Sequence, residues 1–287
     1  MASGPLVVIA GQTASGKTAL AIRLAQSFNG EIVCADSRTV YRYMDIGTAK
    51  PSKSEQEQIS HHLLDIVDPD EKFNAVEMKK IADKAIEDIN SRGKTAFLVG
   101  GTGLFISAVI YNFRFGPKDD SLRSRLDNLS LSELQEEARK IGISDNDISF
   151  DNKRHLARAV ERGGMVKDEK RLRDNCLFIG INQETEELKK RMKSRLENML
   201  ESGLENEVRR LAEKYGWSAP GMNAICYKEW EGYFAGEQSL EKTKQKLYKD
   251  TWHYAKRQKT WFKRDKNIHW VTSGDEAVRL VQQFLIQ

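Results

Sequence analysis

The stretch LVVIAGQTASGKTALAIRLAQSF, residues 6–28, decides the fold. It opens with an apolar run rich in β-branched residues and continues with apolar residues at helical spacing, which predicts a strand, a loop and a helix. The loop completes the pattern G-x-x-x-x-G-K-[ST], the phosphate-cradling P-loop. An ordinary glycine turn is the plain alternative, and the flanking strand and helix argue against it.

Each part of this loop can hold phosphate. Glycines let backbone N–H groups point at phosphate oxygens, and the helix N-terminus adds partial positive charge. The lysine adds a full charge, and the threonine hydroxyl can join the shell of a phosphate-bound Mg²⁺, which makes Thr18 the expected metal ligand. The predicted phosphate-binding residues are Gly11, Gln12, Thr13, Ala14, Ser15, Gly16, Lys17 and Thr18.

The composition bounds the class of protein. Of the 287 residues, 39% are hydrophobic and 31% charged, as in a soluble protein that forms a core. No apolar run approaches the roughly 20 residues needed to span a bilayer, and no signal-type segment is present, so we expect a cytoplasmic protein without membrane contact. Cys34, Cys176 and Cys226 lie far apart, which excludes a zinc finger and disfavours a disulfide framework.

Further apolar runs extend the alternation of strands and helices. GEIVCADSR at 30–38 predicts a second strand, and GKTAFLVGGTGLFISAVI at 93–110 predicts a third strand followed by a helix. This pattern predicts an α/β fold, a P-loop NTPase-like parallel sheet flanked by helices on both faces. Ligands gather at the carboxyl ends of such strands, so we expect Asp36 and residues 100–102 near the P-loop.

The middle of the chain has a different pattern. From about 118 to 215 it reads as polar, charged helices, interrupted by one predicted strand, CLFIGI at 176–181. We expect a helical insertion at about 118–173, with 215 as its outer limit. The catalytic α/β domain would then comprise residues 1–117 and about 174–287, and its last quarter is predicted to be helical.

Positive charge is concentrated in two segments, although the net charge is only +4. Residues 152–173 carry eight Lys/Arg against three Asp/Glu, and residues 242–266 carry ten against two. Both are candidate faces for a polyanion, and a solvated surface is the plain alternative. In the second segment we expect four aromatic residues in the core: Trp252, Tyr254, Trp261 and Phe262. We expect three cations on the solvent side: Lys256, Arg257 and Lys259.

The chain departs from an ordinary P-loop NTPase in one feature. Such enzymes commonly carry an aspartate at the end of a neighbouring strand to help hold Mg²⁺, whereas AFLVGGTG at 96–103 ends in glycines and threonine. The nearest acidic group is Asp36, which could hold a metal, orient a nucleophile or cap the turn into SRTVY. Its position alone leaves these roles open.

Five motifs, in order over nearly the whole chain, resemble those of the tRNA dimethylallyltransferase family. They are AGQTASGKT at 10–18, DSRTVYRYMDIGTAKP at 36–51, HHLLDI at 61–66, GGTGLFI at 100–106 and YAKRQKTWF at 254–262. The resemblance implies transfer of a dimethylallyl group from dimethylallyl diphosphate to N6 of adenosine 37 in the anticodon stem-loop of tRNA. The P-loop would then hold a prenyl diphosphate with Mg²⁺, in a protein expected to be a monomer.

The resemblance also implies roles for individual residues. Asp36 would orient the weakly nucleophilic N6 and accept its proton. Lys17, Thr18 with Mg²⁺, and Arg209 would stabilise the departing diphosphate. For Arg209, Arg123 and Arg158, a solvated surface charge is the alternative. The implied tRNA-contacting positions are Asp36, Ser37, Arg38, Thr39, Thr102, Arg123, Arg154, His155, Leu156, Ala157, Arg158, Asn223, Cys226 and Lys228.

Two positions depart from the family pattern. Cys226 replaces the glycine usual in its motif, which puts the local backbone and contacts in question. Gln12 replaces the usual proline and leaves the phosphate-binding positions intact. His61 and His62 point opposite ways on an extended segment with no third ligand nearby, so we expect structural or substrate-adjacent roles for them.

Three other functions fit parts of the sequence. An adenylate isopentenyltransferase acting on free AMP, ADP or ATP would not need the basic helices. A P-loop kinase for a small metabolite is disfavoured by the missing strand-end aspartate, and a catalytically silent RNA-binding protein by the intact Lys17, Thr18 and Asp36. Because a stacked base cannot present N6 to a buried carbon, the tRNA reaction requires base flipping into the pocket.

Overall fold

The structure, a computed structural model, describes residues 4–113, 115, 120–144, 148–161, 163 and 171–286. The chain divides into two compact units: residues 113–171, and a larger unit of residues 1–112 and 172–287. Residues 185–215, the outer part of the expected insertion, belong to the larger unit. The expected boundary at 117 and 118 lies outside the described residues, as do Arg162, Lys167 and Lys170 of the first basic segment.

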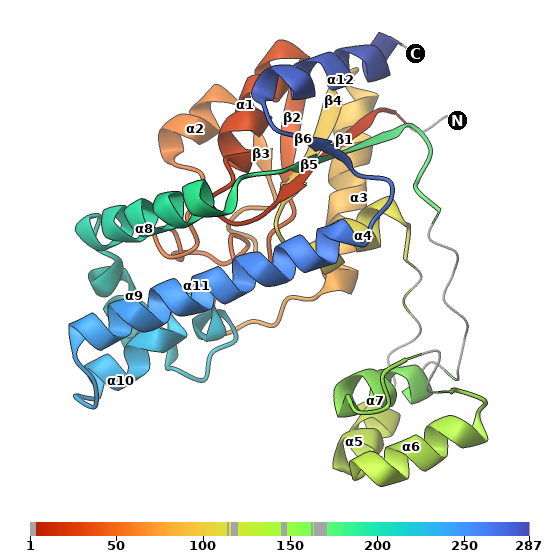
Figure 1. Cartoon of the computed structure of the whole chain (residues 1–287), viewed down its shortest axis with the longest axis vertical. Helices are drawn as coiled ribbons and strands as arrows, with labels where there is room; N and C mark the ends of the chain where they lie inside the picture. The colour runs from red at the N-terminus through yellow and green to blue at the C-terminus, as the bar shows by residue number, and fades with distance from the viewer. Residues whose placement is uncertain are drawn as a thin grey trace. The chain divides into compact units, whose positions relative to one another are not determined.

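One parallel sheet organises the larger unit (Figure 1). The six described strands lie in the order β3-β2-β4-β1-β5-β6, and every neighbouring pair is parallel. This confirms the expected parallel α/β sheet. The strands are β1 (Leu6–Gly11), β2 (Gly30–Cys34), β3 (His61–His62), β4 (Thr95–Gly100), β5 (Cys176–Ile181) and β6 (His269–Val271). The sequence does not predict β6, because its three residues include the exposed His269 and Trp270 and form no apolar run.

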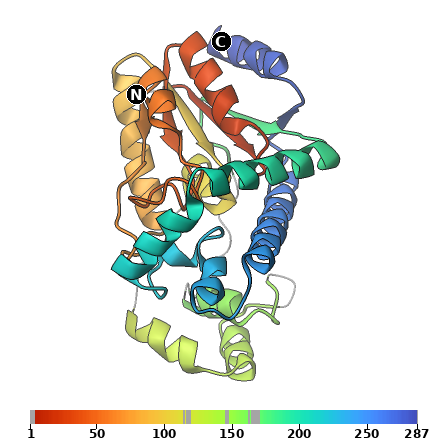
Figure 2. The same ribbon diagram turned by 90° about the vertical axis from the view of Figure 1, so that its left-hand side faces the viewer.

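Helices cover both faces of the sheet. Helices α1 (Lys17–Ser27) and α12 (Gly274–Ile286) lie side by side on one face in both views (Figures 1 and 2). There Val7 and Ile9 of β1 share a core with Ala21 of α1 and Val281 of α12. Because side chains alternate along a strand, Val8 faces the opposite layer. That layer contains α3 (Ala75–Ser91) and α4 (Gly103–Ile110).

The rest of the larger unit surrounds the carboxyl ends of the strands. A second core there contains Met44, Met222, Tyr227 and Trp230, all fully buried. The remaining elements of this unit are α2 (Lys53–Gln58), α8 (Thr185–Glu201), α9 (Leu204–Tyr215), the 3₁₀ turns Gly221–Asn223 and Lys228–Trp230, α10 (Glu231–Phe234) and α11 (Leu240–Lys263). Within the described ranges, none of the helices combines the length and apolar character that a membrane crossing requires.

The smaller unit is helical. It contains α5 (Asp120–Asn128), α6 (Leu131–Lys140) and α7 (Lys153–Glu161). Leu126 of α5, Leu134 of α6 and Leu156 of α7 are fully buried together in its core. Helix α6 begins with a capping box, in which the Ser130 hydroxyl accepts from the N–H of Glu133 and the Glu133 carboxylate accepts from the N–H of Ser130.

Candidate active site

The P-loop follows β1 at the centre of the sheet and leads into α1. Ala14 and Gly16 both have positive φ, at 64° and 90°. Glycine adopts this conformation at 16 without the steric cost that a side chain would add. Lys17 Nζ donates to the carbonyl oxygen of Gln12 at 2.7 Å, which closes the loop on itself. In α1, all of which is described, no side chain caps the N-terminus, so its first N–H groups are available to an anion.

Helix α11 braces the P-loop through glutamine side chains. Gln258 Oε1 accepts from the N–H of Thr13 at 2.8 Å, and Gln258 Nε2 donates to the carbonyl oxygen of Gly101 at 3.0 Å. Gln12, which replaces the family's usual proline, donates from Nε2 to the carbonyl oxygen of Ala255 at 3.0 Å. The loop is therefore tied to a helix more than 200 residues away in the chain, and sequence reasoning did not single out Gln258.

Asp36 lies just beyond the end of β2, as expected. Its Oδ1 accepts from the N–H of Arg38 at 2.8 Å, so it does cap the turn that follows the strand. The N–H of Ser37 donates to Thr102 Oγ1 at 3.1 Å, which joins this turn to the one after β4. The strand-end residues predicted to meet near the P-loop are brought together here.

These segments surround a cavity of about 350 Å³ in the larger unit. Its apolar lining includes Ile32, Met192, Leu196, Met199 and Ile225. Ten of the predicted site residues also line it: Thr13, Lys17, Thr18, Asp36, Ser37, Arg38, Thr39, Asn223, Cys226 and Lys228. Phosphate-binding groups, a carboxylate and an apolar surface therefore face one space.

Two buried cations, Lys17 and Arg195, line this cavity. The pKa of Lys17 is lowered to about 8, mainly by burial and then by the Arg195 guanidinium, while the Asp36 carboxylate acts in the opposite direction. Burial also lowers the pKa of Arg195, opposed by Cys226 and Asp36. Because like charges in a confined site repel, an anion bound between Lys17 and Arg195 would be strongly favoured.

Arg209, expected to bind diphosphate, is not among the lining residues of this cavity. Glu207, Val208 and Leu211 form the buried face of α9, which turns position 209 toward solvent. The Arg209 side chain is 49% exposed, donates from Nη2 to Glu205 Oε1 at 2.8 Å and lies over the Phe234 ring. The structure places Arg195 of α8 where Arg209 was expected. Sequence reasoning missed Arg195, whose only local signal is its place beside the apolar positions Met192, Leu196 and Met199.

Cys226 keeps a glycine-like backbone although it carries a side chain. Its φ is 76°, in the left-handed region that non-glycine residues rarely adopt. The residue is 6% exposed, its N–H donates to Glu229 Oε2 at 2.9 Å, and burial raises the pKa of its thiol to about 12. The three cysteines are free.

The histidines of β3 have separate surroundings. His61 lines the cavity, its Nδ1 lies 2.8 Å from the carbonyl oxygen of Ile59, and burial lowers its pKa. His62 Nε2 lies 2.7 Å from Glu31 Oε2, on a buried carboxylate that also binds Arg92 and Lys94. His61 is thus placed at the cavity and His62 in a structural ion-pair network.

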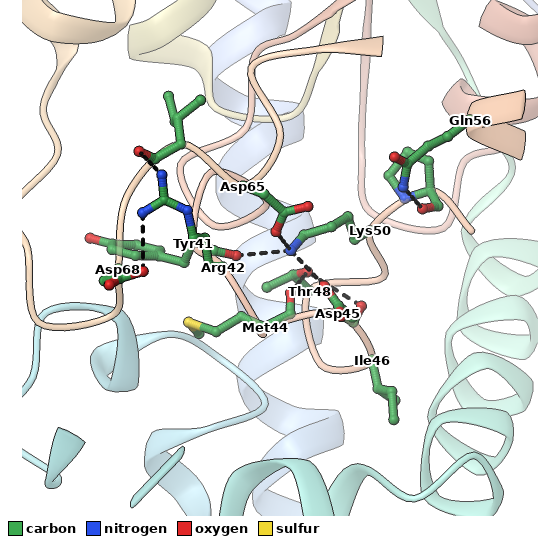
Figure 3. A network of polar contacts seen from close by, with 12 residues as sticks. Tyr41, Arg42, Met44, Asp45, Ile46, Thr48, Lys50, Gln56, Asp65 and Asp68 are labelled. Atoms are coloured by element: carbon green, nitrogen blue, oxygen red, sulfur yellow. Dashed lines mark hydrogen bonds and ion pairs between the residues drawn. The ribbon is translucent and has the colours of Figure 1, made fainter. Parts of the chain in front are cut away.

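The segment after Arg38 is held by a network of polar contacts (Figure 3). Lys50 Nζ contacts Asp45 Oδ1 at 2.6 Å, Asp65 Oδ1 at 2.5 Å and the carbonyl oxygen of Tyr41 at 2.8 Å, and its side chain is only 3% exposed. Arg42 pairs with Asp68 at 3.1 Å. Gly47, Thr48 and Ala49, within this segment, line the cavity.

The predicted tRNA-contacting residues of the smaller unit are placed as follows. Arg154 and His155 of α7 are exposed, whereas Leu156 and Ala157 are 0% and 1% exposed. The side chains of Leu156 and Ala157 therefore belong to the helical core and cannot contact RNA, which corrects that part of the expectation. Arg123 Nη1 donates to Glu161 Oε2 at 2.7 Å, and Arg158 is half-buried.

The aromatic residues of α11 divide between core and surface. Phe262 is 2% exposed and packs edge-on against Phe178 of β5, so the core expectation is confirmed there. It is wrong for Trp261, which is 44% exposed, because the inner face of the helix passes through Ala255, Gln258 and Phe262. Trp252 and Tyr254 are half-buried, Lys256 and Arg257 are exposed, and Lys259 is half-buried.

A P-loop, a strand-end carboxylate and a partly apolar cavity define a P-loop enzyme that acts on a phosphorylated substrate with an apolar part. Residues 39–265 match the family described as IPP transferase, and the chain belongs to this family. It is 44% identical over 283 residues to tRNA dimethylallyltransferase 2 of Geotalea uraniireducens, covering 93% of this chain and 91% of that protein.

Solved structures agree with this assignment. The full-length tRNA isopentenylpyrophosphate transferase of Bacillus halodurans is 34% identical with a TM-score of 0.76, over 99% of this chain and 96% of that one. A eukaryotic dimethylallyltransferase captured acting on tRNA is 25% identical with a TM-score of 0.87, over 99% of this chain and 80% of that one.

Proposed function

We propose that this protein transfers a dimethylallyl group from dimethylallyl diphosphate to N6 of adenosine 37 in the anticodon stem-loop of tRNA, acting as a monomer. The observation that carries the proposal is the cavity in which the P-loop and Asp36 share one space with apolar side chains. Relatives named as tRNA dimethylallyltransferases match the chain over more than nine-tenths of its length, which supports the same reaction.

Asp36 is the group assigned to the nucleophile. In the reaction the C1–O bond of the donor breaks, a C1–N6 bond forms, and the proton of N6 passes to Asp36. The Oδ1 atom already accepts from the N–H of Arg38, so we assign Oδ2 as the atom that accepts the proton from N6. A positioned carboxylate is needed because the lone pair of the adenine amino group is delocalised into the ring.

The leaving diphosphate is assigned to the P-loop together with Lys17 and Arg195. Fixed cations and N–H groups aimed at developing charge stabilise the transition state, because they need no reorganisation when the bond breaks. Thr18 lines the same cavity as Lys17, and its hydroxyl is of the kind that serves as a protein ligand of Mg²⁺. Bound Mg²⁺ would supply further positive charge to the diphosphate oxygens.

Basic side chains of the smaller unit are assigned to the tRNA stem. Arg154 and His155 are exposed on α7, and long-range attraction to phosphates is the main source of affinity in such interfaces. The target base must leave its stack to reach the cavity, so contacts with the loop and contacts with the stem have separate roles.

One incubation tests the proposed function. Labelled dimethylallyl diphosphate is mixed with the protein and either unmodified tRNA or AMP, and the products are digested to nucleosides. We expect N6-dimethylallyladenosine from tRNA and no product from AMP. Product from AMP alone would identify an adenylate isopentenyltransferase, and phosphate transfer from ATP would identify a kinase.

A further inference from the structure

Glu207 of α9 is a buried carboxylate that holds a loop. It is 3% exposed, and its Oε2 accepts from the N–H groups of Asp45 and Ile46 at 3.0 and 2.9 Å. Its Oε1 accepts from the N–H of Gly47 at 3.0 Å and from the Tyr227 hydroxyl at 2.6 Å. Successive N–H groups of this kind form a concave anion-binding nest, here filled by a side chain of the protein itself.

This carboxylate joins two walls of the cavity without touching the cavity. Gly47, Thr48 and Ala49 line one part of it, and Cys226 and Lys228, on either side of Tyr227, line another. Gly47 lies directly against Tyr227, since a Cβ at 47 would lie 2.6 Å from ring carbons. Glu207 accepts from Gly47 in the first wall and from Tyr227 in the second, so it fixes the position of one wall relative to the other.

The opposite side of the same loop is held by Lys50. Its ammonium bridges Asp45 and Asp65 and also donates to the carbonyl oxygen of Tyr41 (Figure 3). Among the residues that the structure describes, no Lys or Arg forms an ion pair with Glu207. Segment 45–50 is thus fixed from two sides, by N–H donors to Glu207 and by the charge of Lys50.

We propose that Glu207 is a positioning residue that fixes the width of the cavity and thereby restricts the prenyl donor to a short chain. The proposal rests on the proposed function. A cavity of about 350 Å³ is near the small end of ligand sites, which span roughly 300–1,000 Å³, and this one must hold both a donor and an adenine. A longer chain fits only if a wall moves, and segment 45–49 moves if its N–H groups lose their acceptor.

The test is the variant Glu207→Gln, with Glu213→Gln on the exposed part of the same helix as matched control. The amide can still accept with its oxygen, but its NH₂ faces a backbone donor. For each protein the kcat/KM for dimethylallyl diphosphate is divided by that for geranyl diphosphate, with tRNA as acceptor. This ratio does not depend on the folded fraction of the enzyme, so a purely structural defect leaves it unchanged.

We expect Glu207→Gln to lower this ratio by about tenfold or more and Glu213→Gln to leave it unchanged. Lys50→Met loosens the same loop from its other side, so it should lower the ratio too and serves if Glu207→Gln does not fold. A wild-type ratio in folded Glu207→Gln would overturn the role of Glu207 while leaving the proposed function intact, and if that variant does not fold, a wild-type ratio in Lys50→Met would do the same. Failure of the wild type to prenylate tRNA would overturn both.

Discussion

Lys17 lies buried in the cavity that Arg195 also lines, and its pKa is lowered to about 8, first by burial and then by the Arg195 guanidinium. Lys17 is charged below this pH and loses its charge above it in the free protein. Bound diphosphate favours the charged form, so affinity should weaken by up to about tenfold per pH unit above pH 8. Calorimetric titration with dimethylallyl diphosphate at several pH values between 7 and 9.5 measures the dissociation constant and its dependence on pH.

The matched variant is Lys17→Arg, which stays charged over the whole range. We expect its affinity to change less between pH 8 and pH 9.5 than that of the wild type. An equally steep decline in both proteins would assign the titration to a group other than Lys17.

Asp36 both caps a turn and faces the cavity, and one substitution separates these roles. Asp36→Asn keeps an oxygen that can accept from the N–H of Arg38, but an amide cannot take up the N6 proton. We expect unchanged thermal stability and donor affinity, with single-turnover transfer slower by about 10² or more. Weakened binding of both substrates at an unchanged transfer rate would make Asp36 a binding residue instead.

Cys226 carries the backbone strain of a left-handed residue, with φ at 76°. Cys226→Ala removes the thiol and keeps the strain, whereas Cys226→Gly removes both. Left-handed backbone costs a side-chain-bearing residue about 1–2 kcal/mol, which exceeds the extra entropy cost of glycine, about 0.5–1 kcal/mol. We therefore expect the glycine variant to be the more stable of the two in urea unfolding, and the reverse order would show that position 226 is not strained.

At the scale of elements, α7 presents two kinds of surface. Leu156, Ala157 and Val160 face the core of the smaller unit, and Arg154 and His155 are exposed. If this helix contacts tRNA, Arg154→Ala combined with Arg158→Ala should weaken tRNA binding. Each lost phosphate contact should reduce the slope of log K against log salt by about 0.7–0.9.

Two controls make that experiment decisive. Thermal unfolding of the double variant detects any damage from replacing the half-buried Arg158, and Lys140→Ala removes an exposed cation from α6 in the same unit. Donor affinity should not change in any of these variants. A salt slope equal to that of the wild type would remove α7 from the interface and favour the basic residues of α11.

At the scale of the whole molecule, elements defined by a local sequence pattern could be predicted, whereas contacts between distant parts of the chain could not. The strand, loop and helix around Lys17 could be predicted because their signals lie within 23 consecutive residues, 6–28. Arg195 could not, because its approach to Lys17 depends on how α8 packs against α11 and the P-loop. The same holds for two other residues. Gln258 accepts a hydrogen bond from the P-loop, 245 residues away in the chain. Glu207 accepts from N–H groups that lie 160 to 162 residues away.

The division into two units leads to a prediction about the molecule as a whole. The N–H of Arg173 donates to the carbonyl oxygen of Ile110 at 2.8 Å, so the two points where the smaller unit leaves and rejoins the chain are adjacent. The two main cores of the larger unit contain only its own residues. Replacing residues 113–171 by a short Gly/Ser linker should therefore leave a folded unit with an unchanged dissociation constant for dimethylallyl diphosphate.

The same deletion should weaken tRNA binding by about tenfold or more, because it removes the cations of α7 to which we assign phosphate contacts. Prenyl transfer at saturating tRNA should be less affected than tRNA affinity, since Lys17, Asp36 and Arg195 all remain. On one preparation, circular dichroism melts measure folding, calorimetry measures donor binding, filter binding measures tRNA affinity, and a prenylation assay at saturating tRNA measures transfer. Unchanged tRNA affinity would place the interface on the larger unit alone, and loss of donor binding would show that the larger unit depends on residues 113–171 for its fold.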